Sequence, residues 1–330
     1  MEKKRSIFAV EVLVSISVLL FVLEFQSNEV LGQAGYPSKP IELVGTDRPG
    51  AQPDVAQRML AEFLKQRLGQ PVIVVSKPGA GGMLGTNYLA KAIPDGYTIT
   101  SIGDAQTITA FLLHKPPYKL DELRGVCLWG YHNNVMAVPA DSPWKTMKEF
   151  IEYAKKNPGV KYCHPGKGYS PWVQVQFLAA QAGIQIEGVP FNADALASAI
   201  MGKQVPIGIC GYTSASPQAE AGKLRMLMTF TPGGIEGEPN LPTLKEVLGK
   251  DVMIYPPVMA IFVPAKTPES VVQTLRKAVK EITSDPTFLS KMKELGVGVK
   301  FGDEEEFHTR QKYMTEVIKK IFVEARLTKD

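Results

Sequence analysis

The chain has 330 residues, a formal net charge of +4 at pH 7 and three cysteines. The charge is small and no basic run stands out, so the sequence does not predict a nucleic-acid partner. An odd cysteine count excludes a complete disulfide framework, and the spacing of Cys127, Cys163 and Cys210 fits no metal motif. We interpret the three as buried small hydrophobic residues, with one disulfide as the alternative.

Residues 1–34 have the pattern of a secretory signal peptide. Three basic residues lie within the first five, and an apolar run over 12–23 follows. This run is shorter than the roughly 20 residues that a membrane-spanning helix needs. Small residues at Gly32 and Ala34 predict cleavage after Ala34. We expect a periplasmic protein exported by this signal, with an uncleaved membrane anchor as the alternative.

The roughly 300 residues that remain suit one large or two modest domains. Apolar runs predict strands over 41–44, 71–76 and 97–102. Helical spacing predicts helices over 54–68, with Asp54 as N-cap, and over 83–93. This βαβ order is typical of an α/β fold with a mostly parallel sheet and helices on both faces.

The same alternation of predicted strands and helices continues in the second half of the chain. Strands are predicted over 134–138, 159–163, 188–191, 205–210 and 225–230, and helices over 146–157, 172–182, 194–202, 268–284 and from 286 and 303 onward. Trp172 is predicted to be either a core residue or a pocket wall. The acidic run 303–306 is interpreted as a solvated helix start that matches the helix dipole, with a metal site as the alternative.

Two similar α/β halves predict a two-lobed architecture. We assign residues 35–133 and 255–330 to the first lobe and 134–254 to the second. The chain is expected to cross between the lobes near 131–135 and to return near 254–259, and a double crossing of this kind makes a hinge.

Three predicted loops each follow a strand and open a helix: the first loop (46–53), the second loop (77–82) and the third loop (164–170). Ligands of open α/β sheets bind beyond the carboxyl ends of strands, where helix N-termini offer free N–H groups. Glycines also let such loops form cradles for anions. The loops therefore predict a carboxylate or phosphate site, and tight strand-to-helix turns are the alternative.

The sequence motifs that would indicate a catalytic site are weak. None of the four histidines has metal-ligand spacing, and no G-x-S-x-G elbow is present. Glycines over 79–85 loosely match a dinucleotide fingerprint, with Asp104 as a conceivable ribose partner. An exported protein has little access to nicotinamide cofactors, so a secreted dehydrogenase is the less favoured hypothesis. We predict no enzymatic activity, no cofactor and no metal.

Several longer motifs occur in order along the chain. They include Tyr-Pro-Ser-Lys-Pro-Ile at 36–41, Lys-Pro-Gly-Ala-Gly-Gly at 77–82, Pro-Asp-Gly-Tyr-Thr at 94–98, Gly-Lys-Gln-Val at 202–205 and Val-Pro-Ala-Lys-Thr-Pro at 263–268. In these motifs the chain resembles the substrate-binding receptors of tripartite tricarboxylate transporters, also called Bug receptors. The resemblance implies a periplasmic Venus-flytrap fold and a carboxylated ligand held between the first and third loops by backbone N–H groups and waters.

The residues nominated for ligand binding lie in the three loops and in two further segments that the resemblance places at the cleft. They are Thr46, Asp47, Arg48, Gly50, Gln52, Gly79, Ala80, Gly81, Asp104, Gln106, His164, Gly166, Lys167, Gly168, Ser170, Tyr212 and Thr213.

Departures from the family pattern bear on the ligand. Thr46, Asp47 and Arg48 stand where the family usually has Pro-Phe-Ala or Pro-Tyr-Ala. Cys210 replaces an aspartate that can meet a ligand amino group, which disfavours an amino-acid ligand. Arg48 and Lys167 are expected either to add charge-assisted hydrogen bonds to an anion or to project into water.

We therefore predict a monomeric receptor that captures a small mono-, di- or aromatic carboxylate and delivers it to a two-component membrane permease. The alternative is a receptor that signals to a membrane sensor without transporting its ligand.

Overall fold

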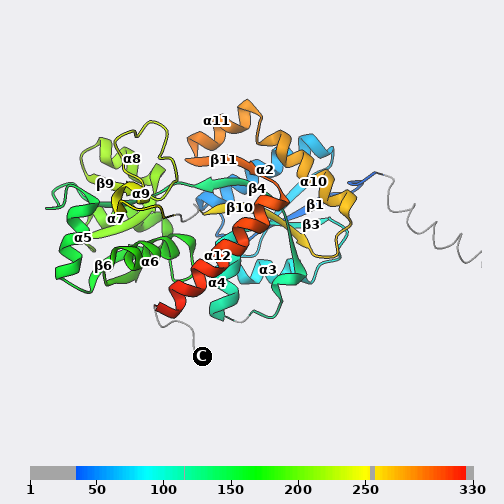
Figure 1. The fold of residues 1–330 in the computed structure, drawn as a ribbon. Coiled ribbons are helices and arrows are strands. Elements are labelled where there is room, and N and C mark those ends of the chain that lie inside the picture. The colour runs from blue at the N-terminus through cyan, green and yellow to red at the C-terminus, as the bar shows by residue number, and fades with distance from the viewer. Residues whose placement is uncertain (1–34, 115, 253–256, 325–330) are drawn as a thin grey trace, which may run out of the picture. The chain divides into compact units, whose positions relative to one another are not determined.

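The computed structural model describes residues 35–114, 116–252 and 257–324. Lys39–Asp330 form one compact unit, which contains two β-sheets with helices packed on them (Figure 1). The predicted signal peptide lies outside the described residues. In the described ranges, no helix is long and apolar enough to cross a membrane.

The first sheet has six strands in the order β11-β4-β10-β3-β1-β2. Its strands are β1 (Ile41–Gly45), β2 (Val72–Ser76), β3 (Thr98–Gly103), β4 (Leu123–His132), β10 (Val258–Pro264) and β11 (Val297–Gly302). The helical segments nearest to it in sequence are α2 (Gln52–Leu68), η1 (Ala80–Gly82), α3 (Met83–Ala90), α4 (Asp104–His114), η2 (Leu120–Glu122), α10 (Glu269–Ile282), α11 (Pro286–Glu294) and α12 (Glu304–Glu324).

The second sheet has five strands in the order β7-β6-β8-β5-β9. Its strands are β5 (Asn134–Pro139), β6 (Val160–His164), β7 (Ile186–Pro190), β8 (Ile207–Gly211) and β9 (Leu224–Thr229). Its helical segments are α5 (Met147–Lys156), α6 (Ser170–Ala182), η3 (Ala193–Ala195), α7 (Leu196–Met201), α8 (Tyr212–Glu220) and α9 (Leu244–Leu248).

Both sheets are mixed, which corrects the prediction of mostly parallel sheets. In the first sheet β1 is parallel to β2 and β3, whereas β10 is antiparallel to β3 and β4. In the second sheet β6 is parallel to β7 and β8, whereas β5 is antiparallel to β8 and β9. The reason lies in the path of the chain. β5 and β10 each begin beside the residues where βαβ strands end, Gly211 and Gly103, and so run in the opposite direction.

The chain passes from one sheet to the other with one residue, Asn133, between β4 and β5. This agrees in position with the crossing expected near 131–135. The expected return near 254–259 lies partly outside the described residues, and β10 begins at Val258. The exact lobe boundaries remain a prediction.

Several local predictions are decided by the structure. Helix α2 begins at Gln52, with Ala51 as N-cap, so the prediction that Asp54 caps it was wrong. Proline fits the first turn of a helix, and Pro53 therefore lies inside α2 rather than ahead of it. Trp172 is a core residue, 3% exposed, and the three cysteines are free and buried.

Helix α12 contacts elements of both sheets. It packs on α4 and β4 and also on α6, and Figure 1 shows it in red along this path. Met314, Ile318 and Phe322 belong to the same apolar cluster as the α6 residue Trp172, and the rings of Phe322 and Trp172 lie 5.9 Å apart. Helix α12 therefore joins the core under the second sheet.

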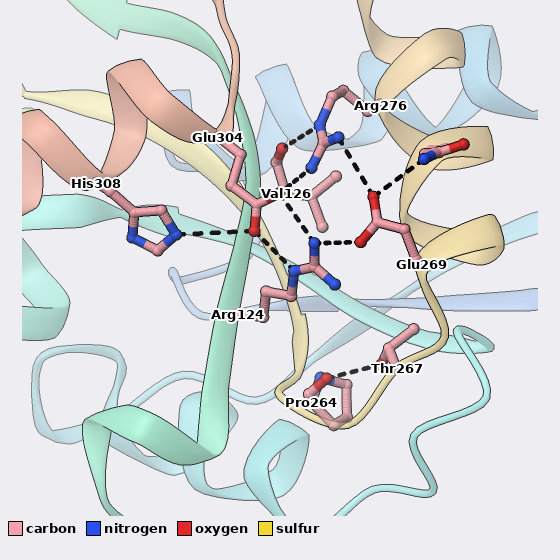
Figure 2. Close-up of polar contacts among 9 residues, drawn as sticks. Arg124, Val126, Pro264, Thr267, Glu269, Arg276, Glu304 and His308 are labelled. Carbon is pink, nitrogen blue, oxygen red and sulfur yellow. Dashed lines mark hydrogen bonds and ion pairs between the residues drawn. The ribbon is translucent and has the colours of Figure 1, made fainter.

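The start of α12 is held by an ion-pair cluster (Figure 2). Glu304 accepts from Arg124 at 2.7 and 2.9 Å and pairs closely with Arg276, while Glu269 pairs with both arginines. The side chain of Glu304 is 24% exposed. The prediction of a solvated acidic start was therefore wrong for Glu304, because two arginines from β4 and α10 converge on it. Ion pairs therefore hold the start of α12, and apolar packing holds its later turns.

Candidate functional site

Residues of the first loop meet residues that follow strands of the second sheet. Nη1 of Arg48 donates to Oδ1 of Asn192, which lies just beyond β7, at 3.2 Å. Tyr169 of the third loop has a raised pKa mainly because it is buried, and the nearby charges of Asp47 and Arg48 act on that pKa in opposite directions. Two loops that the sequence nominated separately therefore lie together.

A second contact between these regions comes from α4. The hydroxyl of Thr109 donates a short hydrogen bond to the carbonyl oxygen of Gly168 in the third loop. Both Thr109 and Gly168 are buried. This bond fixes the glycine turn of the third loop against an element of the first sheet.

The second loop packs tightly against the first. Ala80, Gly81 and Gly82 have successive positive φ angles of 46°, 64° and 88°. Nε2 of Gln106 donates to the carbonyl oxygen of Gly81 at 2.8 Å. A Cβ added at Gly82 would lie 2.8 Å from Nε2 of Gln106 and 3.4 Å from Cβ of Thr46. The glycine at position 82 is therefore required by both its backbone angle and its surroundings.

Helices that begin at the first and third loops have no side-chain cap. The N-cap residues of α2 and α6 are Ala51 and Tyr169, and neither side chain accepts a hydrogen bond from the helix. Helix α8, which follows β8, likewise has Gly211 as N-cap and no side-chain cap. By contrast, α5 and α9 begin with capping boxes at Thr146 and Thr243. Uncapped first turns retain N–H donors for an anion. Missing caps alone do not define a site, since α10 also lacks one.

Gln52 links the first loop to both α8 and the end of β4. Its Nε2 donates to Oγ1 of Thr213 at 3.2 Å and to the carbonyl oxygen of Leu295 at 2.5 Å. Its Oε1 lies 3.1 Å from Nδ1 of His132, so we assign the hydrogen to this nitrogen. Burial lowers the pKa of His132 to about 4, which keeps the imidazole neutral. Gln52 and Thr213 are thus joined to each other by their side chains.

Three nominated residues have partners of their own. Asp104 forms a buried ion pair with Arg310 of α12, and the two residues are 1% and 3% exposed. His164 is fully buried, and its Nδ1 accepts from the N–H of Gly166 at 3.0 Å, so it braces the third loop from within. The hydroxyl of Tyr212 donates to Glu238 at 3.0 Å.

The remaining nominated residues differ in exposure. The N–H of Gly50 donates to Asp54 at 2.9 Å, and Ser170 is buried at the start of α6. Gly79, Ala80 and Lys167 are exposed. In the described ranges Lys167 forms no ion pair, which leaves its ammonium group available.

Sequence reasoning did not nominate Tyr169, Asn192, Thr109 or His132. Asn192 follows directly on a predicted strand, so the strand-end rule that found the three loops applies to it as well. Tyr169 lies inside the third loop, between two nominated residues. Thr109 and His132 gave no sequence signal, since each depends on a contact with a distant segment.

Across the described residues, no group of three His, Cys, Asp or Glu side chains could hold a metal ion. The chemistry that these loops offer is hydrogen bonding from backbone N–H groups, with Arg48 and Lys167 as cations and Asp47 as an acid.

Comparison with known proteins gives a consistent result. The family model for the tripartite tricarboxylate transporter family receptor matches residues 56–323. A UPF0065 protein of Cupriavidus necator is 32% identical over 288 residues, which cover 84% of this chain and 83% of the relative. The structure of the periplasmic binding protein BugD is similar with a TM-score of 0.75 and 26% identity, over 89% of this chain and 100% of that chain.

A third similar structure is MatC from Rhodopseudomonas palustris with bound malate. It has a TM-score of 0.70 and 23% identity, and the match covers 87% of this chain and 98% of that chain. At this level of identity the likeness supports the fold alone.

Proposed function

The chain belongs to the tripartite tricarboxylate transporter receptor family, and from that premise we propose that it binds a small carboxylate outside the cytoplasmic membrane and delivers it to a membrane permease. The ligand class is a mono-, di- or aromatic carboxylic acid. The role is capture and release without chemical change of the ligand.

The observation that carries this proposal is the meeting of the first and third loops. Arg48 donates a hydrogen bond to Asn192, and the charges of Asp47 and Arg48 act on the pKa of Tyr169 in the third loop. The uncapped first turns of α2 and α6 begin at the same loops. An anion placed there would accept hydrogen bonds from backbone N–H groups in the first turns of both α2 and α6.

The proposed mechanism is closure of two lobes, residues 35–133 with 255–330 and residues 134–254. A ligand that touches both lobes binds the closed state more tightly than the open state, and so shifts the population toward closure. The signal peptide proposed for residues 1–34 would export the chain to the periplasm. The closed receptor would then dock on the permease as a monomer.

Titration calorimetry of the purified protein with di-, tri- and aromatic carboxylates tests this function. We expect at least one of them to bind with a Kd below about 1 mM. Failure of every member of the panel to bind would refute the proposed function.

The cations of the site give a second readout. Arg48→Ala and Lys167→Ala should each weaken binding of the best ligand about tenfold or more, because a charge-assisted hydrogen bond is worth about 1.5 kcal/mol or more. Neither change should lower the melting temperature of the unliganded protein. Lys203→Ala, which removes an exposed lysine paired with Asp141, is the matched control and should leave affinity unchanged.

A further inference from the structure

Asp47 is an acid without a cationic partner in the first loop. Its side chain is half-buried, and within the described residues its carboxylate accepts only a long hydrogen bond, to Oδ2 from the hydroxyl of Thr46 at 3.4 Å. In the described part of the chain no lysine, arginine or histidine pairs with it. The adjacent Arg48 donates to Asn192 instead. An acid held in this way is unusual in a loop nominated for an anion.

The surroundings of Asp47 do not supply a substitute partner. Burial raises its pKa to about 6, the Thr46 hydroxyl opposes this shift, and the charge of Asp54 adds to it. Asp54 is itself occupied by Arg58 and by the N–H of Gly50. At neutral pH Asp47 is therefore mainly ionised, and a ligand that carried carboxylates alone would bring a like charge beside it.

Among the described residues, Asp54 of α2 and Tyr169 of the third loop are the groups of other elements that interact electrostatically with Asp47. The carboxylate of Asp54 raises the pKa of Asp47, and Asp47 raises the pKa of Tyr169, on which the charge of Arg48 acts in the opposite direction. The first loop thus carries an anionic acceptor, Asp47, next in sequence to a cation, Arg48. A ligand fits this arrangement when it carries an anionic group and a hydrogen-bond donor close together.

We propose that Asp47 determines ligand selectivity by accepting a hydrogen bond from an ammonium or hydroxyl group of the ligand, while the carboxylate of the same molecule is held by Arg48 and backbone N–H groups. The proposal rests on the proposed function and narrows its ligand class to amino- or hydroxycarboxylates. The shared chemistry is a donor next to a carboxylate.

This inference modifies what the sequence suggested. By its resemblance to the family, the sequence was expected to have Cys210 in place of an aspartate, and that replacement disfavoured a ligand with an amino group. Cys210 is buried, 2% exposed, on β8 in the second sheet. Asp47 follows β1 in the first sheet and can supply an acid from that side instead.

The experiment uses ligands that differ only in the donor group: succinate, L-malate and L-aspartate. At pH 7 we expect the wild-type protein to bind malate or aspartate at least about tenfold more tightly than succinate, since hydrogen bonds to charged groups are worth about 1.5–3 kcal/mol. Asp47→Asn should abolish a preference for aspartate, because the charge is lost. It should only reduce a preference for malate, because the amide oxygen still accepts from a hydroxyl.

Two controls accompany the variant. Asp141→Asn makes the same chemical change at an exposed acid beyond β5, and it should leave all three affinities unchanged. Asp47→Leu removes the acceptor altogether and should abolish both preferences. Melting temperatures of the unliganded variants report whether each one folds.

A measurement on the wild-type protein tests the role of Asp47 even if a variant does not fold. Calorimetry at pH 7 in two buffers of different ionisation enthalpy counts the protons taken up on binding. Succinate should bind with proton uptake, because Asp47 must be neutralised beside it, whereas aspartate should bind with little. Equal proton uptake for the two ligands would overturn the inference.

The outcomes separate this inference from the proposed function. Tight binding of carboxylates without preference for a donor, or a preference that survives Asp47→Leu, would refute the role of Asp47 and leave the receptor function standing. If none of these ligands and no other member of the wider carboxylate panel binds, the proposed function fails and the inference fails with it.

Discussion

Glu304 and Arg310 of α12 differ from the charged side chains of the first and third loops in that they have ion-pair partners. On α12, Glu304 pairs with two arginines and Arg310 pairs with Asp104. On the loops, Asp47, Arg48 and Lys167 form no ion pair with any other described residue. A buried charge costs free energy unless it is paired. The paired charges should therefore matter for stability of the unliganded fold, and the unpaired charges for ligand binding.

The buried pair between Asp104 and Arg310 should give the largest effect. Asp104→Ala removes the carboxylate that meets the buried guanidinium group of Arg310, and we expect a loss of about 3–5 kcal/mol in the free energy of unfolding. Urea denaturation followed by circular dichroism measures this loss. The double variant Asp104→Leu with Arg310→Met should recover most of it, because an apolar pair of similar volume fills the same space.

The same variant tests the sequence-based nomination of Asp104 as a ligand residue. Asp141→Ala, at an exposed pair with Lys203, is the control and should leave the urea midpoint unchanged. If Asp104→Ala kept its stability but lost carboxylate binding, Asp104 would belong to the site and the division between paired and unpaired charges would fail.

Much of the fold was predictable because the decisive signals are local. Thr146 and Glu149 form the capping box that opens α5, close to the predicted start of that helix. The alternation of strands and helices identified the α/β class, and the strand-end rule found the loops that meet in the structure. These features depend on residues a few positions apart, which is the range that periodicity and capping report.

The sequence could not predict which polar groups form hydrogen bonds or ion pairs with distant residues. Asp104 and Arg310 are 206 positions apart, and no local pattern indicates their pairing. His164 looked like a ligand residue because it follows a strand, but its ring accepts from Gly166. The direction of β5 and β10 likewise depends on how the chain passes between sheets, which sequence periodicity does not report.

His132, the last residue of β4 and a hydrogen-bond partner of Gln52, should give the next largest effect on stability. Its pKa is lowered by burial from 6.5 to about 4, so the neutral imidazole is the form that fits the fold. The stability that depends on it is fully present above pH 6.5 and is lost as pH falls toward 4, because the unfolded chain takes up the proton first. We expect a loss of about 2 kcal/mol over this window, after allowance for partial exposure of the ring.

Urea denaturation at a series of pH values between 7 and 4 measures this dependence. His132→Gln should flatten the curve over the window, since glutamine has no proton to bind. The pKa of buried His164 is also lowered, so some slope will remain. A direct check is the NMR titration of the His132 ring. Protonation near pH 6.5 would contradict the predicted neutral form.

The ion-pair cluster at Glu304 should give the smallest effect. The pKa of Glu304 is lowered mainly by hydrogen bonds from Arg124, with burial opposing the shift and the charges of Arg124 and Arg276 adding to it. Its contribution is present above the ordinary value of 4.5 and is lost as pH falls through the lower value in the fold. We expect Glu304→Gln to cost about 1 kcal/mol at pH 7, because the cluster is partly exposed.

The acid end of the stability curve distinguishes this cluster from an ordinary surface pair. Wild-type protein and Glu304→Gln should differ at pH 7 and converge below pH 4.5, since protonation removes the same charge that the substitution removes. Glu316→Gln, at an exposed pair with Lys319 on the same helix, is the matched control and should follow the wild-type curve throughout. Parallel curves for Glu304→Gln and wild type down to low pH would mean that the Glu304 charge does not stabilise the start of α12, and that pairing on this helix does not distinguish it from the loops.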